Sequence, residues 1–447
     1  MFGRVLVANR AEIACRIVRT LHRLGIGSVA VYSDPDVGAK HVREADRAVR
    51  IGEAPAPASY LNPAAIVRAA MESGAEAVHP GYGFLSENAM FARAVTGAGL
   101  AWIGPPPEVL ELTGDKVAAR AAFEASGFPV LPGAGPFAEP AEAVAAGRRL
   151  GFPLMVKAVM GGGGIGMGVA DDEPSLRAAA ETASSRGARF FADPSIYVER
   201  FVPRARHVEV QILADDGATV HLWERECSVQ RRHQKVIEES PSPALDDDLR
   251  TAMCEAAVRS MEAIGYRGAG TVECVLTPEG EFFFLEVNAR IQVEHPVTEV
   301  RFGVDLVDEQ LRIAAGEGMS MTAPPPTAGH RDDPSPAHAI EFRIYAEDPR
   351  TFLPSPGRIG RLDLDRASRW RCDFGYDEGD DVPMFYDPLI GKLVVSEPGR
   401  EIAIDASRAA LGGLRIEGLK TNVPALLSVL EDARFVSGRY DTGLLGK

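Results

Sequence analysis

The stretch GTVECVLTPEGEFFFLEVNARIQVEHPVTE, residues 270–299, contains two apolar runs separated by the tetrapeptide TPEG. Proline at the second position of TPEG and glycine at the fourth are typical of a β-turn, so we predict an antiparallel hairpin. A tight hairpin pairs these residues across its two strands: Cys274 with Phe283, Val272 with Leu285, and Glu273 with Phe284. Glu286 is then diagonal to Glu273 on the same face, and Asn288 lies two residues further along.

The two glutamates of this hairpin form a candidate metal site. Diagonal neighbours on one sheet face are about 7–8 Å apart, so the carboxylates of Glu273 and Glu286 can converge on the same ions. Hard oxygen ligands of this kind suit Mg²⁺ that bridges to substrate phosphates. The alternative is that both glutamates are solvated on an exposed face. Phe282 and Phe284 share that face, which makes full exposure unfavourable and favours metal binding.

Polar residues continue at every second position after the hairpin. Arg290, Gln292 and Glu294 alternate along the same strand direction and should project from one face. An arginine can hold a small oxyanion through its planar guanidinium, and a nearby glutamate can accept a proton from that oxyanion. The segment QRRHQK, residues 230–235, concentrates four basic side chains in an acidic protein. Such a run is usually a solvated face, but here it is the strongest candidate for a phosphate or bicarbonate clamp.

The first 113 residues alternate strands with helices, which is the pattern of a parallel, doubly wound sheet. The expected strands are RVLVA (4–8), SVAVYS (28–33), EAVHP (76–80) and AWIG (101–104). The expected helices are one with apolar residues recurring from Ile13 to Leu24, one at Pro63–Met71, and one opened by Ser86. The turn after the first strand, ANRAEIA, lacks the glycines that let a backbone approach a pyrophosphate. A dinucleotide site is therefore not expected there.

From residue 114 to about 330 the pattern changes to pairs of strands, with one helix at about 246–264. The segment KAVMGGGGIGMGVADD, residues 157–172, joins one strand to the next through four glycines and lacks the G-K-[ST] of a P-loop. It is either a hairpin lid over phosphates or a mobile surface turn. The proline-rich segment 322–336 is typical of a linker into a third unit.

Length and composition limit the class of protein. At 447 residues the chain is too long for one core, and a prior of about 150 residues per domain suggests about three domains. The net charge of −15 argues against a general nucleic-acid binder. Five cysteines without a C-x-x-C pair fit a reducing cytosol better than a disulfide framework or a zinc site. No apolar run reaches about 18 residues and a strand begins almost at once, so we expect a cytoplasmic protein without a signal peptide or membrane span.

Six segments occur in a specific order: HPGYGFLSEN (79–88), GDK (114–116), ERECSVQRRHQKVIEESP (224–241), LEVNARIQVEHPVTE (285–299), AEDP (346–349) and TFLPSPG (351–357). Together they resemble biotin carboxylase, the ATP-grasp component of biotin-dependent acyl-CoA carboxylases, over essentially the whole chain. The resemblance implies a combined α/β and α+β fold with three domains. These are a Rossmann-like N-terminal domain (1–113), an ATP-grasp domain (114–329) with a mobile lid at about 130–202, and a C-terminal biotin carboxylase domain (330–447). The implied activity is that of an ATP-dependent ligase, which converts ATP, bicarbonate and carrier-bound biotin into carboxybiotin, ADP and phosphate.

The same resemblance implies how the nucleotide is bound. It assigns the phosphates of ATP to Lys116, Lys157, His233 and the backbone of Gly162, Gly163 and Gly164. It places the adenine along Glu199 to Val202, and the ribose region at His207 and Gln230. It assigns Mg²⁺, or Mn²⁺ in its place, to Glu273 and Glu286 with Asn288 assisting.

The resemblance also implies roles for the residues that handle bicarbonate and biotin. Bicarbonate would be held by Lys235, Arg290, Gln292 and the backbone of Val293. Glu294 would be the base that deprotonates bicarbonate for attack on the γ-phosphate. Arg343 would stabilise the biotin enolate, with Tyr82 and Gly83 against the ureido ring. These implied roles fit the chemistry of the reaction. Phosphoryl transfer depends on positioning and charge neutralisation, which the lysines and the metal supply, and an enolate requires a permanent cation, which Arg343 supplies.

Five positions depart from the pattern of the family, and three of them lie in the lid. Ile165 stands where the family usually has Lys or Arg, and Val159 and Met160 stand where it has small residues. Ala289 replaces the usual Thr or Pro, and Ala11 replaces a glycine of the first turn. The glycines at 161–164 are intact, so we expect the loop to hold ATP phosphates through its backbone with one cation fewer.

The sequence also carries expectations about partners. No Met-Lys-Met biotinylation sequence occurs, and no length remains for a carboxyltransferase. We therefore expect the biotin carboxyl carrier protein and the carboxyltransferase subunits to be separate polypeptides, with acetyl-CoA or propionyl-CoA as the default acceptor. A homodimer without nucleic-acid or membrane partners is what the resemblance suggests. Two alternatives stay open: another ATP-grasp ligase, and a catalytically weakened ATP-binding subunit of a carboxylase complex, which the lid changes would favour.

Overall fold

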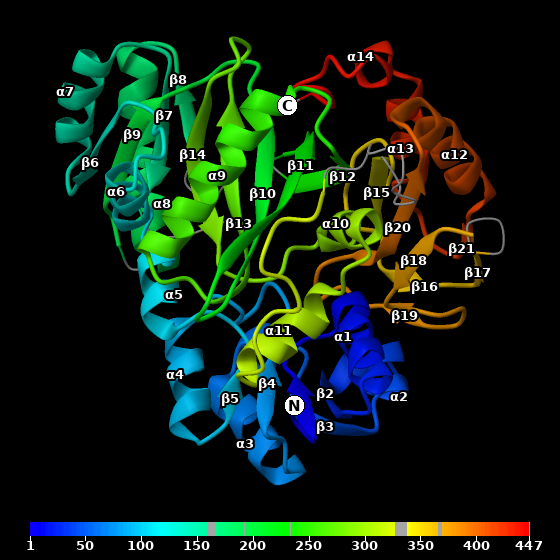
Figure 1. Cartoon of the computed structure of the whole chain (residues 1–447). Helices are drawn as coiled ribbons and strands as arrows, with labels where there is room; N and C mark the ends of the chain where they lie inside the picture. The colour runs from blue at the N-terminus through cyan, green and yellow to red at the C-terminus, as the bar shows by residue number, and fades with distance from the viewer. Residues whose placement is uncertain (160–166, 192, 233, 327–337, 365–368, 447) are drawn as a thin grey trace.

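The N-terminal part of the chain forms a five-stranded parallel sheet in the order β3-β2-β1-β4-β5, at the bottom of Figure 1. The structure is a computed structural model that describes residues 1–159, 167–191, 193–232, 234–326, 338–364 and 369–446. The strands are β1 (Arg4–Val7), β2 (Gly27–Ser33), β3 (Arg47–Gly52), β4 (Ala77–His79) and β5 (Ala101–Trp102). The helices are α1 (Ala11–Arg23), α2 (Lys40–Glu44), α3 (Pro63–Ser73) and α4 (Ala89–Gly97). The parallel pairing confirms the doubly wound prediction, although β3 and α2 were not anticipated.

The helix expected to open at Ser86 begins three residues later. Its cap is Asn88, whose side chain accepts the backbone N–H of Phe91 at 2.8 Å. Ser86 instead lies in a turn, where its backbone N–H donates to the carbonyl of Gly83 at 2.9 Å. Asparagine and serine are about equally favourable as N-caps, so residue preference alone could not choose between the two positions.

Eight antiparallel strands form the central sheet, in the order β14-β13-β10-β11-β12-β15-β20-β18 (Figure 1). They are β10 (Arg206–Ala214), β11 (Thr219–Arg231), β12 (Gln234–Ser240), β13 (Gly268–Leu276), β14 (Phe282–Asn288), β15 (His338–Tyr345), β18 (Arg371–Phe374) and β20 (Leu389–Glu397). The associated helices are α9 (Asp247–Ala263), α10 (His295–Phe302) and α11 (Leu306–Ala314). Helix α9 confirms the helix expected at about 246–264. Because β15, β18 and β20 follow residue 330, one sheet combines strands from both sides of the expected linker.

A second antiparallel sheet, in the order β6-β9-β7-β8, occupies the range expected for the lid (upper left in Figure 1). Its elements are β6 (Gly133–Phe137), α7 (Pro140–Leu150), β7 (Leu154–Ala158), β8 (Gly168–Ala170), α8 (Glu173–Phe191) and β9 (Ile196–Arg200). The connection from the N-terminal sheet contains α5 (Pro107–Gly114) and α6 (Lys116–Ala125). Because β7 pairs antiparallel with β8, the glycine segment does join strand to strand. Residues 160–166, which include the four glycines and Ile165, lie outside the described residues.

The β13–β14 hairpin is present, but its register differs from the prediction. The observed pairs are Glu273 with Glu286, Val272 with Val287, and Cys274 with Phe284. The predicted pairing is wrong because the partner of Glu273 lies two residues further along the second strand than in a tight hairpin. The turn is one residue longer, with Gly280 at φ +86° and the Thr277 N–H donating to the Glu281 carbonyl at 2.8 Å. A β-bulge between the pairs of Glu273 and Cys274 adds the second residue.

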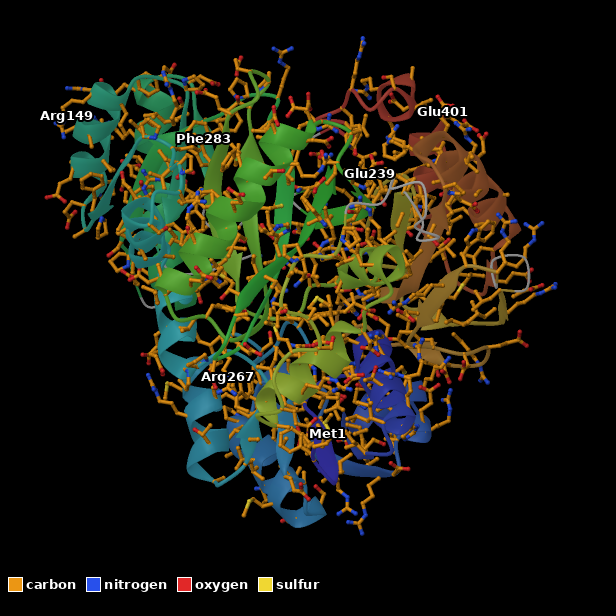
Figure 2. The ribbon with its side chains drawn as sticks, viewed as in Figure 1. Met1, Arg149, Glu239, Arg267, Phe283 and Glu401 are labelled. Carbon is orange, nitrogen blue, oxygen red and sulfur yellow. The ribbon has the colours of Figure 1, made fainter. Side chains whose placement is uncertain are left out.

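The C-terminal part adds small sheets and helices beside the central sheet (orange and red in Figure 1). Its elements are β16 (Gly357–Arg358), β17 (Arg361–Asp363), β19 (Asp381–Val382), α12 (Arg400–Gly413), β21 (Arg415–Glu417), α13 (Val423–Glu431) and α14 (Ala433–Val436). Glu239 of β12 is labelled in Figure 2. It accepts hydrogen bonds from Arg400 and from His338, each at 2.7 Å, and so links the central sheet to α12. None of the described helices is both long and apolar enough to cross a membrane.

Candidate active site

Lys235 lies at the centre of a cluster of carboxylates contributed by distant parts of the chain. Its Nζ is 2.5 Å from Glu209 on β10, 2.8 Å from Glu273 on β13, and 2.7 Å from Glu294 at the start of α10. Burial alone would lower the pKa of Lys235, but the three carboxylates outweigh burial and raise it well above its usual value. Lys235 is therefore a charged side chain that holds the three acidic groups together.

Glu294 is a fully buried carboxylate with a cation on each oxygen. Oε1 contacts Lys235, and Oε2 is 2.9 Å from Nη2 of Arg343 on β15. Burial would raise the pKa of Glu294, but Lys235, Arg343 and Arg225 together hold it well below its usual value. The group is therefore ionised, as a general base must be before it accepts a proton.

Tyr82 comes to the same region from the N-terminal sheet. Asn9 fixes the loop by donating to the Tyr82 carbonyl at 2.7 Å, and the Tyr82 hydroxyl donates to Glu12. Glu12 in turn lies 3.1 Å from Lys392 on β20, whose Nζ also donates to the carbonyl of Val293 at 2.8 Å. Tyr82 is thus connected, through two charged side chains, to the residue next to Glu294.

The predicted metal ligands Glu273 and Glu286 lie directly opposite each other on β13 and β14. Burial first, and then the charge of Glu273, raise the pKa of Glu286. The amide of Asn288 donates to Oε1 of Glu273 at 2.7 Å. Two facing carboxylates that repel each other are a donor set that fits a divalent hard cation, which would relieve the repulsion.

Two of the predicted phosphate-binding lysines lie near Glu286. Lys116 is the first residue of α6, and burial lowers the pKa of its ammonium group. The charges of Lys116 and Lys157 both act on Glu286. Lys157 on β7 also forms a 2.5 Å ion pair with Glu199 on β9. Val202 follows β9 in the loop toward β10.

His207 and Gln230, predicted for the ribose region, lie against Glu273. His207 Nε2 is 3.0 Å from Glu273 Oε2, and its Nδ1 is 3.0 Å from the amide nitrogen of Gln230. Burial would lower the pKa of His207, but Glu273 and its neighbours raise it. Ligand atoms of His207, Glu209 and Glu273 lie within 4.8 Å of one another, so these three residues could also hold an ion. That set shares only Glu273 with the predicted metal ligands.

Arg290 and Gln292 join this cluster, but not as residues of a strand. Strand β14 ends at Asn288 and α10 begins after Glu294, so the expected alternation along one strand is wrong. The side chains still converge: Arg290 donates to Asn288 at 2.8 Å and to Gln292 at 2.9 Å, and Gln292 donates to Glu273 at 3.2 Å. Arg290 also pairs with Glu87, from the motif of the N-terminal part, at 2.9 Å.

Sequence reasoning also missed three charged residues around Lys235 and Arg343, in addition to Glu12, Glu87 and Lys392. Glu209 contacts Lys235, Arg225 pairs with Glu209 at 2.6 Å, and Glu238 accepts from Nε of Arg343 at 2.6 Å. The alternation in HVEVQ, residues 207–211, could have indicated Glu209, because it places that residue on the same face as His207. Of the predicted residues, Gly162, Gly163, Gly164 and His233 lie outside the described part of the chain.

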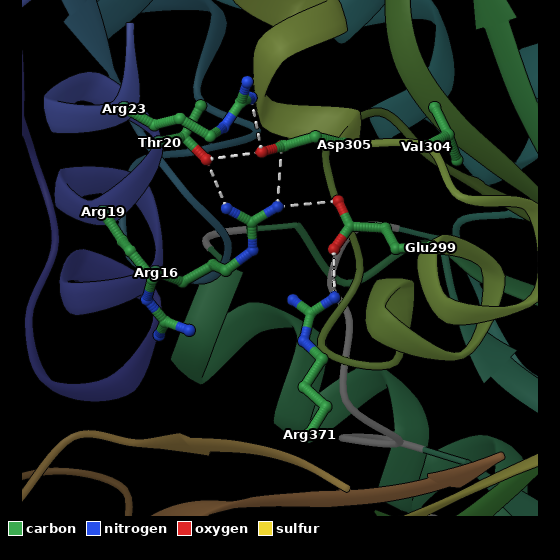
Figure 3. Close-up of a pocket in the computed structure, with 8 residues that line it drawn as sticks. All are labelled: Arg16, Arg19, Thr20, Arg23, Glu299, Val304, Asp305 and Arg371. Carbon is green, nitrogen blue, oxygen red and sulfur yellow. Dashed lines mark hydrogen bonds and ion pairs between the residues drawn. The ribbon is translucent and has the colours of Figure 1, made fainter. Parts of the chain in front are cut away.

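The described residues also line a polar cavity of about 240 Å³ beside α1, and none of its lining residues is a predicted site residue (Figure 3). Its lining residues are Arg16, Arg19, Thr20, Arg23, Glu299, Val304, Asp305 and Arg371. Each of the four arginines has a carboxylate partner, as with Arg16, which pairs with Glu299 and Asp305 at 2.7 Å each. None of these arginines is therefore left without an ionic partner in the described part of the chain.

Comparison with known families covers most of the chain in three matches. Residues 1–110 match the biotin carboxylase N-terminal domain, and residues 341–447 match the biotin carboxylase C-terminal domain. Residues 115–322 match the ATP-binding domain of the carbamoyl-phosphate synthase L chain.

Similar proteins extend over the whole chain. A biotin carboxylase of Halalkalibacterium halodurans is 48% identical over 447 residues, covering 100% of this chain and 97% of the relative. The propionyl-CoA carboxylase alpha chain of Ruegeria pomeroyi is 43% identical and covers 100% of this chain and 68% of the relative. Among solved structures, the biotin carboxylase domain dimer of Hydrogenobacter thermophilus 2-oxoglutarate carboxylase, in complex with MgADP, ADP and bicarbonate, is 40% identical. It superposes with a TM-score of 0.94 and covers 100% of this chain and 97% of that chain.

Proposed function

This chain belongs to the biotin carboxylase family, and we propose that it carboxylates biotin on a separate carrier protein as the first half-reaction of an acyl-CoA carboxylase. It is an ATP-dependent ligase whose co-substrates are ATP and bicarbonate. The observation that supports these residue roles most strongly is the pair of contacts at Glu294. Lys235 holds one oxygen of this carboxylate and Arg343 holds the other. The proposed domain boundaries remain 113/114 and 329/330.

ATP would bind between the N-terminal end of α6 and the β13–β14 hairpin. Lys116 and Lys157 would neutralise phosphate charge there, and Glu199 to Val202 would line the adenine. His233 and the backbone of Gly162, Gly163 and Gly164 lie outside the described residues and stay assigned to the phosphates. Bound Mg²⁺ supplies charge neutralisation on the phosphates. Glu273 and Glu286 would hold the ion, assisted by Asn288, because their facing carboxylates repel each other without it.

Bicarbonate would sit against Lys235, Arg290, Gln292 and the backbone of Val293. Glu294 removes its proton, which makes the oxyanion a better nucleophile toward the γ-phosphate. In the free site, Lys235 and Arg343 keep Glu294 ionised and weakly basic. An anion beside Lys235 shares the attraction of that cation, so the proton affinity of Glu294 rises when bicarbonate is bound.

Biotin would be activated beside Arg343, with Tyr82 and Gly83 against its ureido ring. Arginine remains charged under all working conditions, so it can stabilise the negative charge that develops on the ureido oxygen. Attack of bicarbonate on the γ-phosphate gives carboxyphosphate and ADP. The carboxyl group then passes from carboxyphosphate to the ureido nitrogen, and the phosphate leaves with the proton of that nitrogen. His207 and Gln230 remain assigned to the nucleotide side of the site, where their contacts with Glu273 also support the metal ligand.

The proposed partners follow from the two other tasks of a biotin-dependent carboxylase, which are to carry biotin and to transfer the carboxyl group to the acceptor. A biotin carboxyl carrier protein would present biotin, and separate carboxyltransferase subunits would pass the carboxyl group to acetyl-CoA or propionyl-CoA. The similarity to the Ruegeria pomeroyi propionyl-CoA carboxylase alpha chain supports an acyl-CoA acceptor. The dimeric domain of the Hydrogenobacter thermophilus relative supports a homodimer.

The experiment that tests this function is ADP formation from MgATP by the purified chain. We expect slow turnover that requires bicarbonate and becomes faster when free biotin is added. The same assay without bicarbonate, with and without biotin, gives the background. ATP hydrolysis that is indifferent to both additions would refute the assignment.

A further inference from the structure

The buried carboxyl groups of Glu238 and Glu341 face each other, and Glu238 is in contact with Arg343. Glu238 on β12 pairs directly with Glu341 on β15, so their side chains project from the same face of the central sheet. Directly opposite residues of an antiparallel pair have Cβ atoms about 4.5–5.5 Å apart. Neither residue has any exposed surface.

The hydrogen bonds leave three of the four carboxyl oxygens without a partner. Arg343 donates from Nε to Oε1 of Glu238 at 2.6 Å, and its Nη2 lies 2.5 Å from a Glu238 carboxyl oxygen. Within the described part of the chain, Oε2 of Glu238 and both oxygens of Glu341 have no hydrogen-bond partner. Buried polar atoms are almost always paired in folded proteins, so three unpaired oxygens at one place require an explanation.

The charges around the pair cannot support two carboxylates. Arg343, Lys235 and Glu294 act on Glu238, and Lys392, Arg343 and Glu294 act on Glu341. Arg343 already pairs with Glu294, and Lys392 is already bound to Glu12 and to the carbonyl of Val293. Burial raises the pKa of Glu238 to about 7 and that of Glu341 well above its usual value. At neutral pH the pair therefore retains a proton.

We propose that Glu238 and Glu341 share one proton, which Glu341 donates to the free oxygen of Glu238, and that the pair acts as the positioning element for Arg343. This inference rests on the proposed function. When Glu294 accepts the proton of bicarbonate it loses its charge, and with that charge its hold on Arg343. Glu238 is then the remaining anionic partner, and the hydrogen bond from Glu341 keeps its carboxylate in one orientation. Arg343 thus stays aimed at biotin during the step that follows.

The first test compares two glutamates that are neighbours on β12. Glu238→Gln removes the charge that faces Arg343, whereas Glu239→Gln removes an equally buried charge on the other face, which pairs with Arg400 and His338. We expect Glu238→Gln to reduce the biotin-stimulated kcat about tenfold or more while changing the KM for ATP by less than about threefold. The bicarbonate-dependent turnover without biotin should persist. Glu239→Gln should lower thermal stability but keep the stimulation by biotin.

The second test addresses the shared proton through two substitutions of nearly equal size. Glu341→Gln keeps an N–H donor for the free oxygen of Glu238, whereas Glu341→Met removes the donor. We expect Glu341→Gln to retain the biotin-stimulated rate within about threefold, and Glu341→Met to lose about tenfold. Infrared spectroscopy of the wild-type protein at neutral pH should show the carbonyl band of a buried protonated carboxyl group, and this band should disappear in both variants.

Each result decides one part of the proposal. Unchanged biotin stimulation in Glu238→Gln would overturn the positioning role, and equal rates in the Gln and Met variants, or a missing infrared band, would overturn the shared proton. If Glu238→Gln fails to fold, the Glu341 variants still test the effect of the pair on the biotin-stimulated rate, and the infrared band still tests the shared proton. A wild-type protein without bicarbonate-dependent ADP formation would refute the proposed function instead, and the infrared band would still test the proton.

Discussion

Lys235 organises the site at the scale of single residues, because one ammonium group satisfies three buried carboxylates. The sequence indicated Lys235 as part of a basic run and Glu273 and Glu294 as acidic candidates. The alternation in HVEVQ places Glu209 on the same face as His207, but it does not predict the contact with Lys235, because that contact depends on β10 lying between β13 and β11 in the sheet. This strand order brings together residues that are far apart in the chain, and local sequence patterns do not predict the order of strands in a sheet.

The metal assignment leads to the first prediction. Replacing Glu286 by Gln keeps the shape of the side chain but removes one of the two facing charges. We expect the turnover of MgATP to fall at least about 100-fold, because the electrostatic stabilisation of the phosphates is weakened. Raising the Mg²⁺ concentration should recover part of the loss. Near-normal activity at ordinary Mg²⁺ would contradict the role of the β13–β14 pair.

The second prediction separates the base from the biotin-binding cation. Glu294→Gln should reduce bicarbonate-dependent turnover by about 100-fold or more while leaving ATP binding nearly unchanged, because the base acts after the nucleotide is bound. Arg343→Ala should spare bicarbonate-dependent ATP hydrolysis and remove the stimulation by biotin. ATP titration by calorimetry provides the affinity. If both variants lose ATP affinity equally, the two residues have structural roles only.

At the scale of elements, the agreement between sequence and structure depends on how local the determinant is. Helix α1 was predicted because the apolar spacing from Ile13 to Leu24 is read from nearby positions, and α9 agrees with the helix expected at about 246–264. The type of the β13–β14 element was predicted as well, but its register was not. The longer turn at Gly280 and the bulge beyond Cys274 each insert one residue, and a bulge has no distinctive sequence in this strand.

The third prediction concerns the contact between α1 and α11 at the polar cavity (Figure 3). Asp305 caps α11 by accepting the N–H of Val307 at 3.0 Å, and it also binds Arg16, Thr20 and Arg23 of α1 at 2.7–2.9 Å. Asp305→Ala removes both the cap and a partly buried ionic partner, so we expect a loss of about 3 kcal/mol. Asp305→Asn keeps the capping oxygen and should lose less.

Urea unfolding of the two Asp305 variants measures these costs. The rate per folded molecule should stay at the wild-type value, because Asp305 has no contact with the predicted site residues within the described chain. A loss below about 1 kcal/mol for Asp305→Ala would show that the helix cap alone accounts for the contribution of this residue.

At the scale of the whole molecule, the central sheet unites parts of the chain that the sequence separates into different domains. Strands β12 and β15 pair across the expected linker, and this pairing brings Arg343 to Glu294. The motifs of the family resemblance predicted both residues, but nothing in the local sequence predicted that strands from both sides of the linker share one sheet. Long-range strand pairing is decided by burial over the whole fold, so local residue preferences do not reveal it.

The fourth prediction uses the pH dependence of the contact between the central sheet and α12. Burial would raise the pKa of Glu239, but His338 and Arg400 lower it to about 2. The unfolded chain takes up this proton at a higher pH than the folded chain, so the contribution to stability is complete above about pH 4.5 and disappears as the pH falls toward 2. We expect Glu239→Gln to have a lower melting temperature than wild type at pH 7. The difference should narrow between pH 5 and about pH 3, and a constant difference would contradict the ionic role.

The most direct test of the account is the transfer of label from bicarbonate to biotin. The purified chain is incubated with MgATP, free biotin and carbon-14 bicarbonate, and acid-labile carboxybiotin is counted. We predict that labelled carboxybiotin forms only when ATP, Mg²⁺ and bicarbonate are all present, and that Arg343→Ala abolishes it while ADP is still released. ADP release by the wild-type chain without any labelled carboxybiotin would contradict the claim that this site carboxylates biotin.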